Sequence, residues 1–382
     1  MTTYLACMGT RPEIIKMAPI YRTLKAQGED VQVLHTGQHE EVAQALYRFF
    51  DMDPDFQIQL RRQKPTLSNL TAELLQGIDG VIDKVKPDVV LVQGDTASAL
   101  VGAMAGYYRD VPVAHVEAGL RTGQHDPFPE EKNRELIGRL ARWHFPPTPQ
   151  AADNLRREGI APQQIFEVGN TVIDAALWVK NQMAQNGAPD ALPTEVRSFM
   201  QCHAASRLML VTAHRRENWG KPIQQIASTV GILLRLHPDL TVVWPLHPNP
   251  SVRADIQNVF SSLDAASRQR LCLTDPLEYP ALISLLAHCH FCLTDSGGIQ
   301  EEASAFQCPV LITRDSTERQ ELVDAGGAVL VGTDPHRIVE QACALLNDRW
   351  AYRAMQVQES PFGDGHSAQR IADVLTCARS TH

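Results

Sequence analysis

The sequence lacks the features that mark a secreted, membrane-bound or nucleic-acid-binding chain. No basic region followed by a long apolar stretch comes after Met1, so a secretory signal is not expected. The most apolar window, Asp88–Tyr108, contains Gln93 and Asp95, and a membrane span is therefore not expected either. The formal net charge of -9 supplies no basic surplus for nucleic-acid phosphates, so we expect no nucleic-acid partner.

Cysteine is also sparse, with 8 residues scattered over a chain of 382. A chain of this size buries a sufficient core without disulfides, so we expect reduced thiols and a cytoplasmic location. The segment His288–Cys292 contains a C-x-x-C pattern with interleaved histidines. A zinc site would need a second ligand pair, which Cys308 alone does not supply. No metal site is therefore expected.

The sequence does contain a regular alternation of short apolar runs and helical patterns. Near-continuous runs of Val and Leu indicate strands buried on both faces, and their alternation with helices predicts a doubly wound α/β architecture. The expected strands are Tyr4–Met8, Val31–Thr36, Asp88–Gln93, Val111–Val116, Leu208–Thr212, Leu240–Pro245, Phe291–Thr294 and Val310–Thr313. The clearest helices are Glu13–Gln27, Leu67–Val85, Pro222–Leu236 and Gly298–Phe306.

A break in this alternation divides the chain. The stretch Lys180–His203 interrupts the pattern, and strands and helices resume on both sides of it. We therefore expect two Rossmann-like domains that face a cleft. The first should comprise residues 1–169 and, through a returning C-terminal helix, 366–382; the second should comprise 170–365. Ligands of such sheets lie beyond the carboxyl ends of the strands, so functional side chains are expected in the loops there.

The first such loop is suited to an anion. Gly9–Glu13 directly follows the first strand and leads into a helix, whose N-terminus attracts negative charge. Arg11 would add a fixed charge, and Lys16 would project from the same helix end. An ordinary capped turn with a solvated arginine explains the loop equally well.

Another loop, in the second domain, has a sharper pattern. Ser296, Gly297 and Gly298 lie at a strand-to-helix turn, where glycine exposes backbone N–H groups to an anion. Glu302 lies four residues after Gly298 on the same helix face, so its carboxylate could accept both ribose hydroxyls of a nucleotide. Arg319 follows the next strand and adds positive charge. A structural tight turn is the alternative, since Gly-Gly alone is a weak signal.

Acidic residues stand at three positions of the first domain that follow a strand or precede a helix. Asp95 and Glu117 each stand at the end of an apolar strand, and Glu130 and Glu131 precede a helix. Carboxylates in a half-buried cleft act as general acids or bases near neutral pH. Asp95 could instead be a helix N-cap, and one of Glu130 and Glu131 should serve the helix dipole. A magnesium site is the chemical alternative.

Histidines follow two strands of the second domain. His214 stands beside Arg215 after one strand, a combination suited to a diphosphate. His247 follows the next strand in a loop stiffened by three prolines. A lone histidine in a loop usually has no special role, but two at neighbouring strand ends indicate a site.

As an ordered set, these segments resemble the bacterial, non-hydrolysing UDP-N-acetylglucosamine 2-epimerases. The resemblance runs from about residue 4 to beyond residue 334. The matching segments are Gly9–Glu13 with Lys16, Gln93–Asp95, His115–Arg121, Pro129–Glu131 with Asn133 and Arg134, Gly169–Asp174, His214–Asn218, His247–Pro250 and Asp295–Glu302.

The resemblance implies a GT-B architecture, a homodimer, and reversible conversion of UDP-N-acetylglucosamine to UDP-N-acetylmannosamine for surface polysaccharide synthesis. The implied route is anti elimination of UDP to a bound 2-acetamidoglucal, then re-addition, with no NAD and no metal. The implied catalytic residues are Asp95, Glu117, Glu130 and His214. The residues implied to lie near the UDP are Arg11, Lys16, Arg215, His247, Ser296, Gly297, Gly298, Glu302 and Arg319.

Some segments depart from the family pattern. The loop Gly123–Pro127 is one residue shorter than usual, so Glu130 rather than Glu131 aligns with the catalytic position. Around the site where allosteric relatives bind a second UDP-N-acetylglucosamine, this chain has Glu40 with Glu41 and Val42, and Lys64 with Pro65. Acidic residues raise the cost of binding a diphosphate there. We therefore expect hyperbolic kinetics.

Three other functions fit parts of the pattern. A GT-B glycosyltransferase would share the Gly-Gly turn and the ribose-binding Glu302. A hydrolysing epimerase would release UDP and free N-acetylmannosamine. A non-catalytic sugar-nucleotide sensor would keep the UDP loops but would not need the carboxylates. Product analysis after incubation with UDP-N-acetylglucosamine separates all of these.

Overall fold

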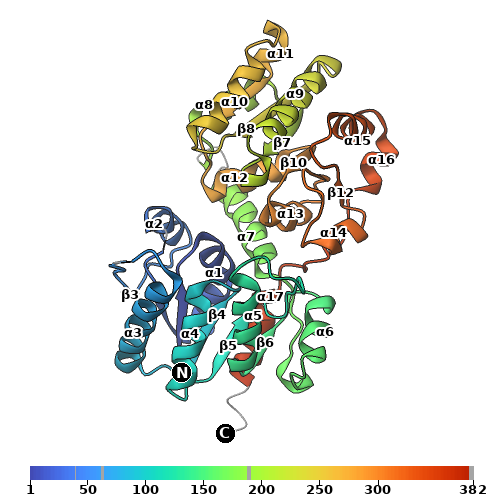
Figure 1. The fold of residues 1–382 in the computed structure, drawn as a ribbon. Helices are drawn as coiled ribbons and strands as arrows, with labels where there is room; N and C mark the ends of the chain where they lie inside the picture. The colour runs from blue at the N-terminus through green and yellow to red at the C-terminus, as the bar shows by residue number, and fades with distance from the viewer. Residues whose placement is uncertain (39, 62–63, 187–190, 378–382) are drawn as a thin grey trace. The chain divides into compact units, whose positions relative to one another are not determined.

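The computed structural model describes residues 1–38, 40–61, 64–186 and 191–377. The chain forms two compact units, each built around a six-stranded parallel sheet with flanking helices (Figure 1). Unit 1 joins Met1–Ala175 to Phe362–His382, and unit 2 is Ala176–Pro361. The prediction of two Rossmann-like, doubly wound domains is confirmed.

The sheet of unit 1 has the strand order β3-β2-β1-β4-β5-β6. Every residue of β4 is buried, as expected for a strand covered on both faces. Because β1, β4 and β5 are neighbours and parallel, the loops that follow them meet at one edge of the sheet. The strands are β1 (Thr3–Met8), β2 (Asp30–His35), β3 (Phe56–Gln57), β4 (Val89–Gln93), β5 (Val113–Val116) and β6 (Trp143–Phe145).

The sheet of unit 2 has the order β12-β11-β10-β7-β8-β9. Here β10, β7 and β8 are parallel neighbours, so the loops after these three strands also meet at one edge. The strands are β7 (Arg207–Thr212), β8 (Leu240–Pro245), β9 (Leu271–Thr274), β10 (Phe291–Thr294), β11 (Val310–Ile312) and β12 (Ala328–Leu330).

Helices connect successive strands in both units. In unit 1 they are α1 (Arg11–Ala26), α2 (Glu40–Phe49), α3 (Leu67–Val85), α4 (Ala97–Tyr108), α5 (Glu130–Leu140), α6 (Pro149–Arg157) and α17 (Ser367–Cys377). Helix α7 (Thr171–Asn186) begins in unit 1 and continues into unit 2. Unit 2 holds α8 (Thr194–Cys202), α9 (Lys221–Leu236), α10 (Pro250–Phe260), α11 (Ala265–Gln269), α12 (Tyr279–His288), α13 (Gly297–Ser304), α14 (Gln320–Asp324), α15 (Pro335–Asn347) and α16 (Arg349–Ala354).

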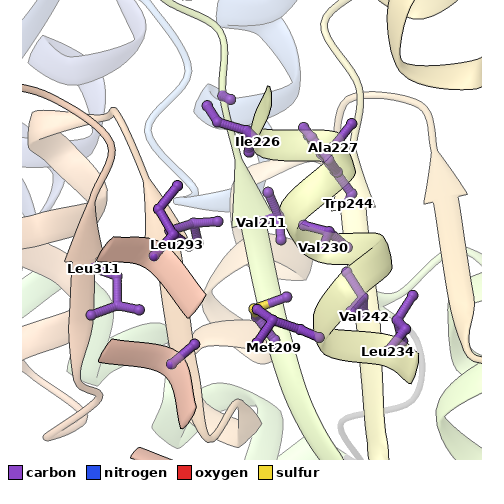
Figure 2. Packing of buried hydrophobic residues seen from close by; sticks show 14 of the residues in the cluster. Met209, Val211, Ile226, Ala227, Val230, Leu234, Val242, Trp244, Leu293 and Leu311 are labelled. Carbon is purple, nitrogen blue, oxygen red and sulfur yellow. The ribbon is translucent and has the colours of Figure 1, made fainter. Parts of the chain in front are cut away.

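The core of unit 2 shows how the helical pattern is used. Ile226, Val230 and Leu234 are spaced four residues apart on α9 and therefore share one face of the helix. Figure 2 shows this face lying against side chains of the sheet, among them Trp244 and Val211. All of these side chains have no exposed surface. Their burial fixes the sheet from which the loops of unit 2 project.

Four short strands were not expected from the sequence: β3, β6, β9 and β12. Each is the edge strand of its sheet. An edge strand pairs on one side only, and these have between 2 and 4 residues. In β3, β9 and β12 the residues are only partly buried, so these short runs lack the continuous apolar pattern of a strand that is covered on both faces. The strands inside the two sheets were expected to within two residues at either end.

The C-terminal helix α17 belongs to unit 1, where it packs against α1. Asp174, near the start of α7, accepts a hydrogen bond of 2.8 Å from the backbone N–H of Ala368. Gly169 has φ +92°, and a side chain there would come within 2.7 Å of the Ser367 hydroxyl. The position therefore requires glycine. The start of α7 and the start of α17 are thus fastened together.

Two buried histidines on neighbouring strands make stability depend on pH. Burial lowers the pKa of His115 from 6.5 to about 3 and that of His144 to about 4, so both are neutral in the native protein. Unfolded histidines take up protons below pH 6.5, so this stability is complete above pH 6.5 and is lost as pH falls towards 4. For His144 the loss is about 3 kcal/mol at most. We expect Tm, followed by calorimetry, to fall across this window.

The variant His144→Gln is expected to flatten that decline, because it removes one of the two titrations. The matched control is His336→Gln at an exposed position, which should leave the slope unchanged. An unaltered slope in His144→Gln would contradict the assignment.

Candidate active site

Asp95 lies at the edge where the loops of unit 1 meet. It follows β4, next to the loop after β5, and its carboxylate forms an ion pair of 2.6 Å with Arg134. Burial raises its pKa; Arg134 and Lys16 act in the opposite direction, and the neighbouring charges of Glu117 and Glu130 add to the increase. A carboxyl group with a raised pKa is suited to exchanging a proton near neutral pH. The structure therefore brings together Asp95, Glu117, Glu130 and Lys16.

Glu117 is held more tightly than its neighbours. Its carboxylate accepts hydrogen bonds from Lys16 Nζ and from Gln93 Nε2, and a third from Asn170 Nδ2 at 3.3 Å. Its φ is +61°, a left-handed backbone conformation that side chains other than glycine rarely adopt. Non-glycine residues held in such conformations cluster at functional sites. Three hydrogen-bond donors therefore orient the Glu117 carboxylate.

Glu130 and Glu131 have different surroundings. Glu131 is 2% exposed and accepts backbone hydrogen bonds of 3.0 Å from both Thr122 and Gly123. It therefore anchors the loop that precedes α5. Glu130 is only partly buried, and its charge acts on Asp95. The structure thus gives Glu131 the structural role and leaves Glu130 beside the other carboxylates.

The loop Gly9–Glu13 is a capped turn. Glu13 is buried and accepts the backbone N–H groups of Gly9 at 3.0 Å and Thr10 at 2.7 Å. It also accepts a hydrogen bond of 2.6 Å from Thr96, in the Asp95 loop. These two N–H groups are therefore engaged within the protein, and the positive charge here comes from Arg11, the first residue of α1, and from Lys16. The sequence patterns did not reveal that Glu13 joins two of the loops.

Asp295 organises the loops of unit 2. It has no exposed surface and follows β10. It accepts backbone hydrogen bonds of 2.9 Å from His214 and Arg215 and a side-chain hydrogen bond of 2.9 Å from Asn218. The His214 ring nitrogen Nδ1 lies 3.2 Å from the same carboxylate. Asp295 thereby fixes His214 and Arg215 beside the Ser296–Gly298 turn, a role that was not predicted.

Arg319 lies next to the turn at the start of α13. A Cβ atom on Gly297 would lie 3.3 Å from the guanidinium carbon of Arg319. Arg319 Nε donates a hydrogen bond of 2.8 Å to Glu301, which is 2% exposed. Glu302 is also buried in the same helix. An anchored cation at a helix N-terminus favours an anionic ligand.

His247 is connected to His214 through Trp219. The His247 ring lies 5.5 Å from the Trp219 ring, and Trp219 Nε1 donates a hydrogen bond of 3.3 Å to the His214 carbonyl. His247 Nδ1 accepts the backbone N–H of Asn249 at 3.1 Å. Since Nδ1 is an acceptor, a neutral ring carries its proton on Nε2, where it can be donated to a ligand.

Two further observations concern metals and membranes. Among the residues that the structure describes, no three His, Cys, Asp or Glu side chains are arranged to hold a metal ion. Within the same ranges, no helix combines the length and the apolarity that a bilayer crossing requires.

Part of the expected regulatory site is not described. His39 and the side chains of Glu40, Glu41 and Val42 lie outside the described residues. The expectation that these residues disfavour a second UDP-N-acetylglucosamine therefore stays a prediction.

Comparisons with known proteins agree with one another. The family described as UDP-N-acetylglucosamine 2-epimerase matches residues 22–376. A UDP-N-acetylglucosamine 2-epimerase of Yersinia pestis is 41% identical over 374 residues, 97% of each chain.

Solved structures show the same similarity. A putative UDP-N-acetylglucosamine 2-epimerase from Listeria monocytogenes has a TM-score of 0.89 and 34% identity, covering 100% of this chain and 97% of that one. A UDP-GlcNAc 2-epimerase from Neisseria meningitidis bound to UDP-GlcNAc has a TM-score of 0.85 and 36% identity, covering 98% of this chain and 100% of that one. The fold is therefore the GT-B-like fold of these enzymes.

Proposed function

The chain belongs to the UDP-N-acetylglucosamine 2-epimerase family, and from that premise we propose that it is of the non-hydrolysing type. It interconverts UDP-N-acetylglucosamine and UDP-N-acetylmannosamine. The observation that best supports this activity is the grouping of Asp95, Glu117 and Glu130 around Lys16 at one sheet edge. Inverting carbon 2 requires removal of a proton from one face and delivery to the other, so more than one proton-transfer group is needed.

The proposed reaction begins with loss of the proton on carbon 2 to a carboxylate. The carbon–oxygen bond at carbon 1 breaks, its electron pair leaves with UDP, and 2-acetamidoglucal remains bound. UDP then adds back to carbon 1 while carbon 2 receives a proton on its other face. Asp95, Glu117 and Glu130 handle these protons, and His214 stabilises the charge that develops on the departing diphosphate.

The nucleotide is proposed to bind mainly through unit 2. The turn before α13 and Arg319 bind the diphosphate, and Glu302 accepts the ribose hydroxyls. The full set of proposed substrate-binding residues is Arg11, Lys16, Arg215, His247, Ser296, Gly297, Gly298, Glu302 and Arg319. No NAD and no metal take part. We also propose a cytoplasmic homodimer that supplies polysaccharide precursors.

Reaction in deuterated water is expected to place deuterium at carbon 2 of both epimers, because that proton is removed and replaced in each cycle. Turnover is expected to be unchanged when NAD is omitted and a chelator is added. Nuclear magnetic resonance of the two sugar nucleotides measures both the label and the rate.

The same assay separates the alternatives. Free N-acetylmannosamine together with UDP would identify a hydrolysing epimerase, and transfer of the sugar to an acceptor would identify a glycosyltransferase. Epimerised product without deuterium would exclude the elimination step.

A further inference from the structure

One residue of unit 1 joins the segment that returns from unit 2 to Glu117, a proposed proton-transfer carboxylate. The chain leaves unit 1 within α7 and returns to it at Phe362. Asn170, the residue before α7, donates its backbone N–H to the carbonyl of Phe362 at 2.6 Å. Its side-chain amide donates to Glu117 at 3.3 Å. One buried residue thus contacts the outgoing helix, the returning segment and Glu117.

The side chain of Asn170 has two separate functions in this arrangement. Its Oδ1 accepts the backbone N–H of Val172 at 3.1 Å, which caps the first turn of α7. Its Nδ2 donates to Glu117 Oε1, the oxygen that also receives Lys16 Nζ. The other oxygen, Oε2, receives Gln93 Nε2. Lys16 belongs to α1 and Gln93 ends β4, whereas Asn170 donates from the segment just before α7.

We propose that Asn170 is a positioning residue for Glu117 and fixes its carboxylate relative to the start of α7 and to the returning segment at Phe362. This inference rests on the proposed epimerase function. Asn170 is 3% exposed, and Gly169 before it packs against Gly363 with no room for a side chain. The backbone that holds the Asn170 side-chain amide is therefore fixed in position. A small displacement of the segment at Phe362 would be transmitted to Glu117 through one residue.

The test exploits the separation of the cap from the donor. Asn170→Ser keeps an oxygen that can cap α7 but has no amide to donate to Glu117. We expect kcat to fall by about tenfold to a hundredfold, the range for a lost hydrogen bond to a charged group, with KM changed less than about threefold. Tm should fall no more than in the matched control Asp334→Ser, which makes a comparable exchange at the cap of α15.

A second variant adds a pH readout. Asn170→Asp keeps a good capping oxygen and places a second carboxylate beside Glu117, which already has Lys16 on α1 and Asp95 after β4 among its charged neighbours. Like charges disfavour ionisation, so the acid limb of the pH profile of kcat should move to higher pH by about one unit. A purely structural role would leave this limb in place.

The outcomes distinguish the inference from the proposed function. An inactive wild-type protein would overturn the proposed function. An active wild type with unchanged kcat in Asn170→Ser, or an unmoved acid limb in Asn170→Asp, would overturn the positioning role alone. If Asn170→Ser and Asp334→Ser lost the same amount of kcat and the same amount of Tm, Asn170 would serve only to cap α7.

Discussion

Replacing Glu117 with glutamine is expected to lower kcat between about a hundredfold and ten-thousandfold, the usual contribution of a general acid or base. Glutamine has nearly the same shape: its oxygen can still accept from Asn170, and its amide nitrogen can donate to Gln93 once the Gln93 amide is turned over, but it cannot exchange a proton. The dissociation constant for UDP should change less than about threefold, since most of the proposed nucleotide anchors lie in unit 2 and Lys16, which contacts Glu117, keeps its charge. Turnover is measured by chromatography of the two sugar nucleotides, and UDP binding by calorimetry.

The control for this variant is Glu167→Gln, the same exchange at an exposed position of unit 1. It should retain full activity. If UDP binding and turnover fell together in Glu117→Gln, the proposed division between proton transfer and nucleotide binding would be wrong. Loss of labelling at carbon 2 in deuterated water should accompany the loss of turnover.

Replacing Glu302 with glutamine is expected to weaken UDP binding by about a hundredfold or more. Glu302 is 6% exposed in α13, and its proposed partners are both ribose hydroxyls. Hydrogen bonds to a charged acceptor contribute about 1.5–3 kcal/mol each, and the neutral amide loses most of this. Calorimetric titration with UDP gives the affinity, and Glu359→Gln is the exposed control.

A ligand without one hydroxyl tests the assignment directly. With the wild-type protein, 2′-deoxy-UDP should bind more weakly than UDP. With Glu302→Gln the difference between the two ligands should shrink, because the group that recognises the hydroxyl has been altered. The same ligand difference in both proteins would show that Glu302 acts elsewhere.

The strand ends were the most predictable part of this molecule. Buried strands such as β4 and β5 are nearly continuous apolar runs, and the acidic residue that follows each run marks the loop after the strand. Asp95 and Glu117 were identified for that reason. The edge strands β3 and β6 were not, because they have only two and three residues, and Gln57 and His144 interrupt their apolar pattern.

The partners of the site residues could not be predicted in the same way. Asp295 and Glu13 are buried carboxylates that accept hydrogen bonds from other loops. Those contacts arise only when strands that are distant in sequence become neighbours. The residue pattern alone did not separate Glu130 from Glu131, because both stand in the first turn of α5. The family resemblance favoured Glu130 as the catalytic residue, and the folded loop at Thr122 shows what Glu131 does instead.

The return of α17 to unit 1 has a consequence for synthesis on the ribosome. Met1–Ala175 leaves the exit tunnel first, but the helix that packs on α1 follows only after all of unit 2 has been made. Unit 2 can therefore reach its final contacts as soon as it emerges, whereas unit 1 must wait for Ser367–Cys377. Domains usually fold in the order in which they emerge. In this chain, the earliest-made part is completed last, so a nonsense mutation near residue 366 would leave the carboxylate-bearing unit unfinished.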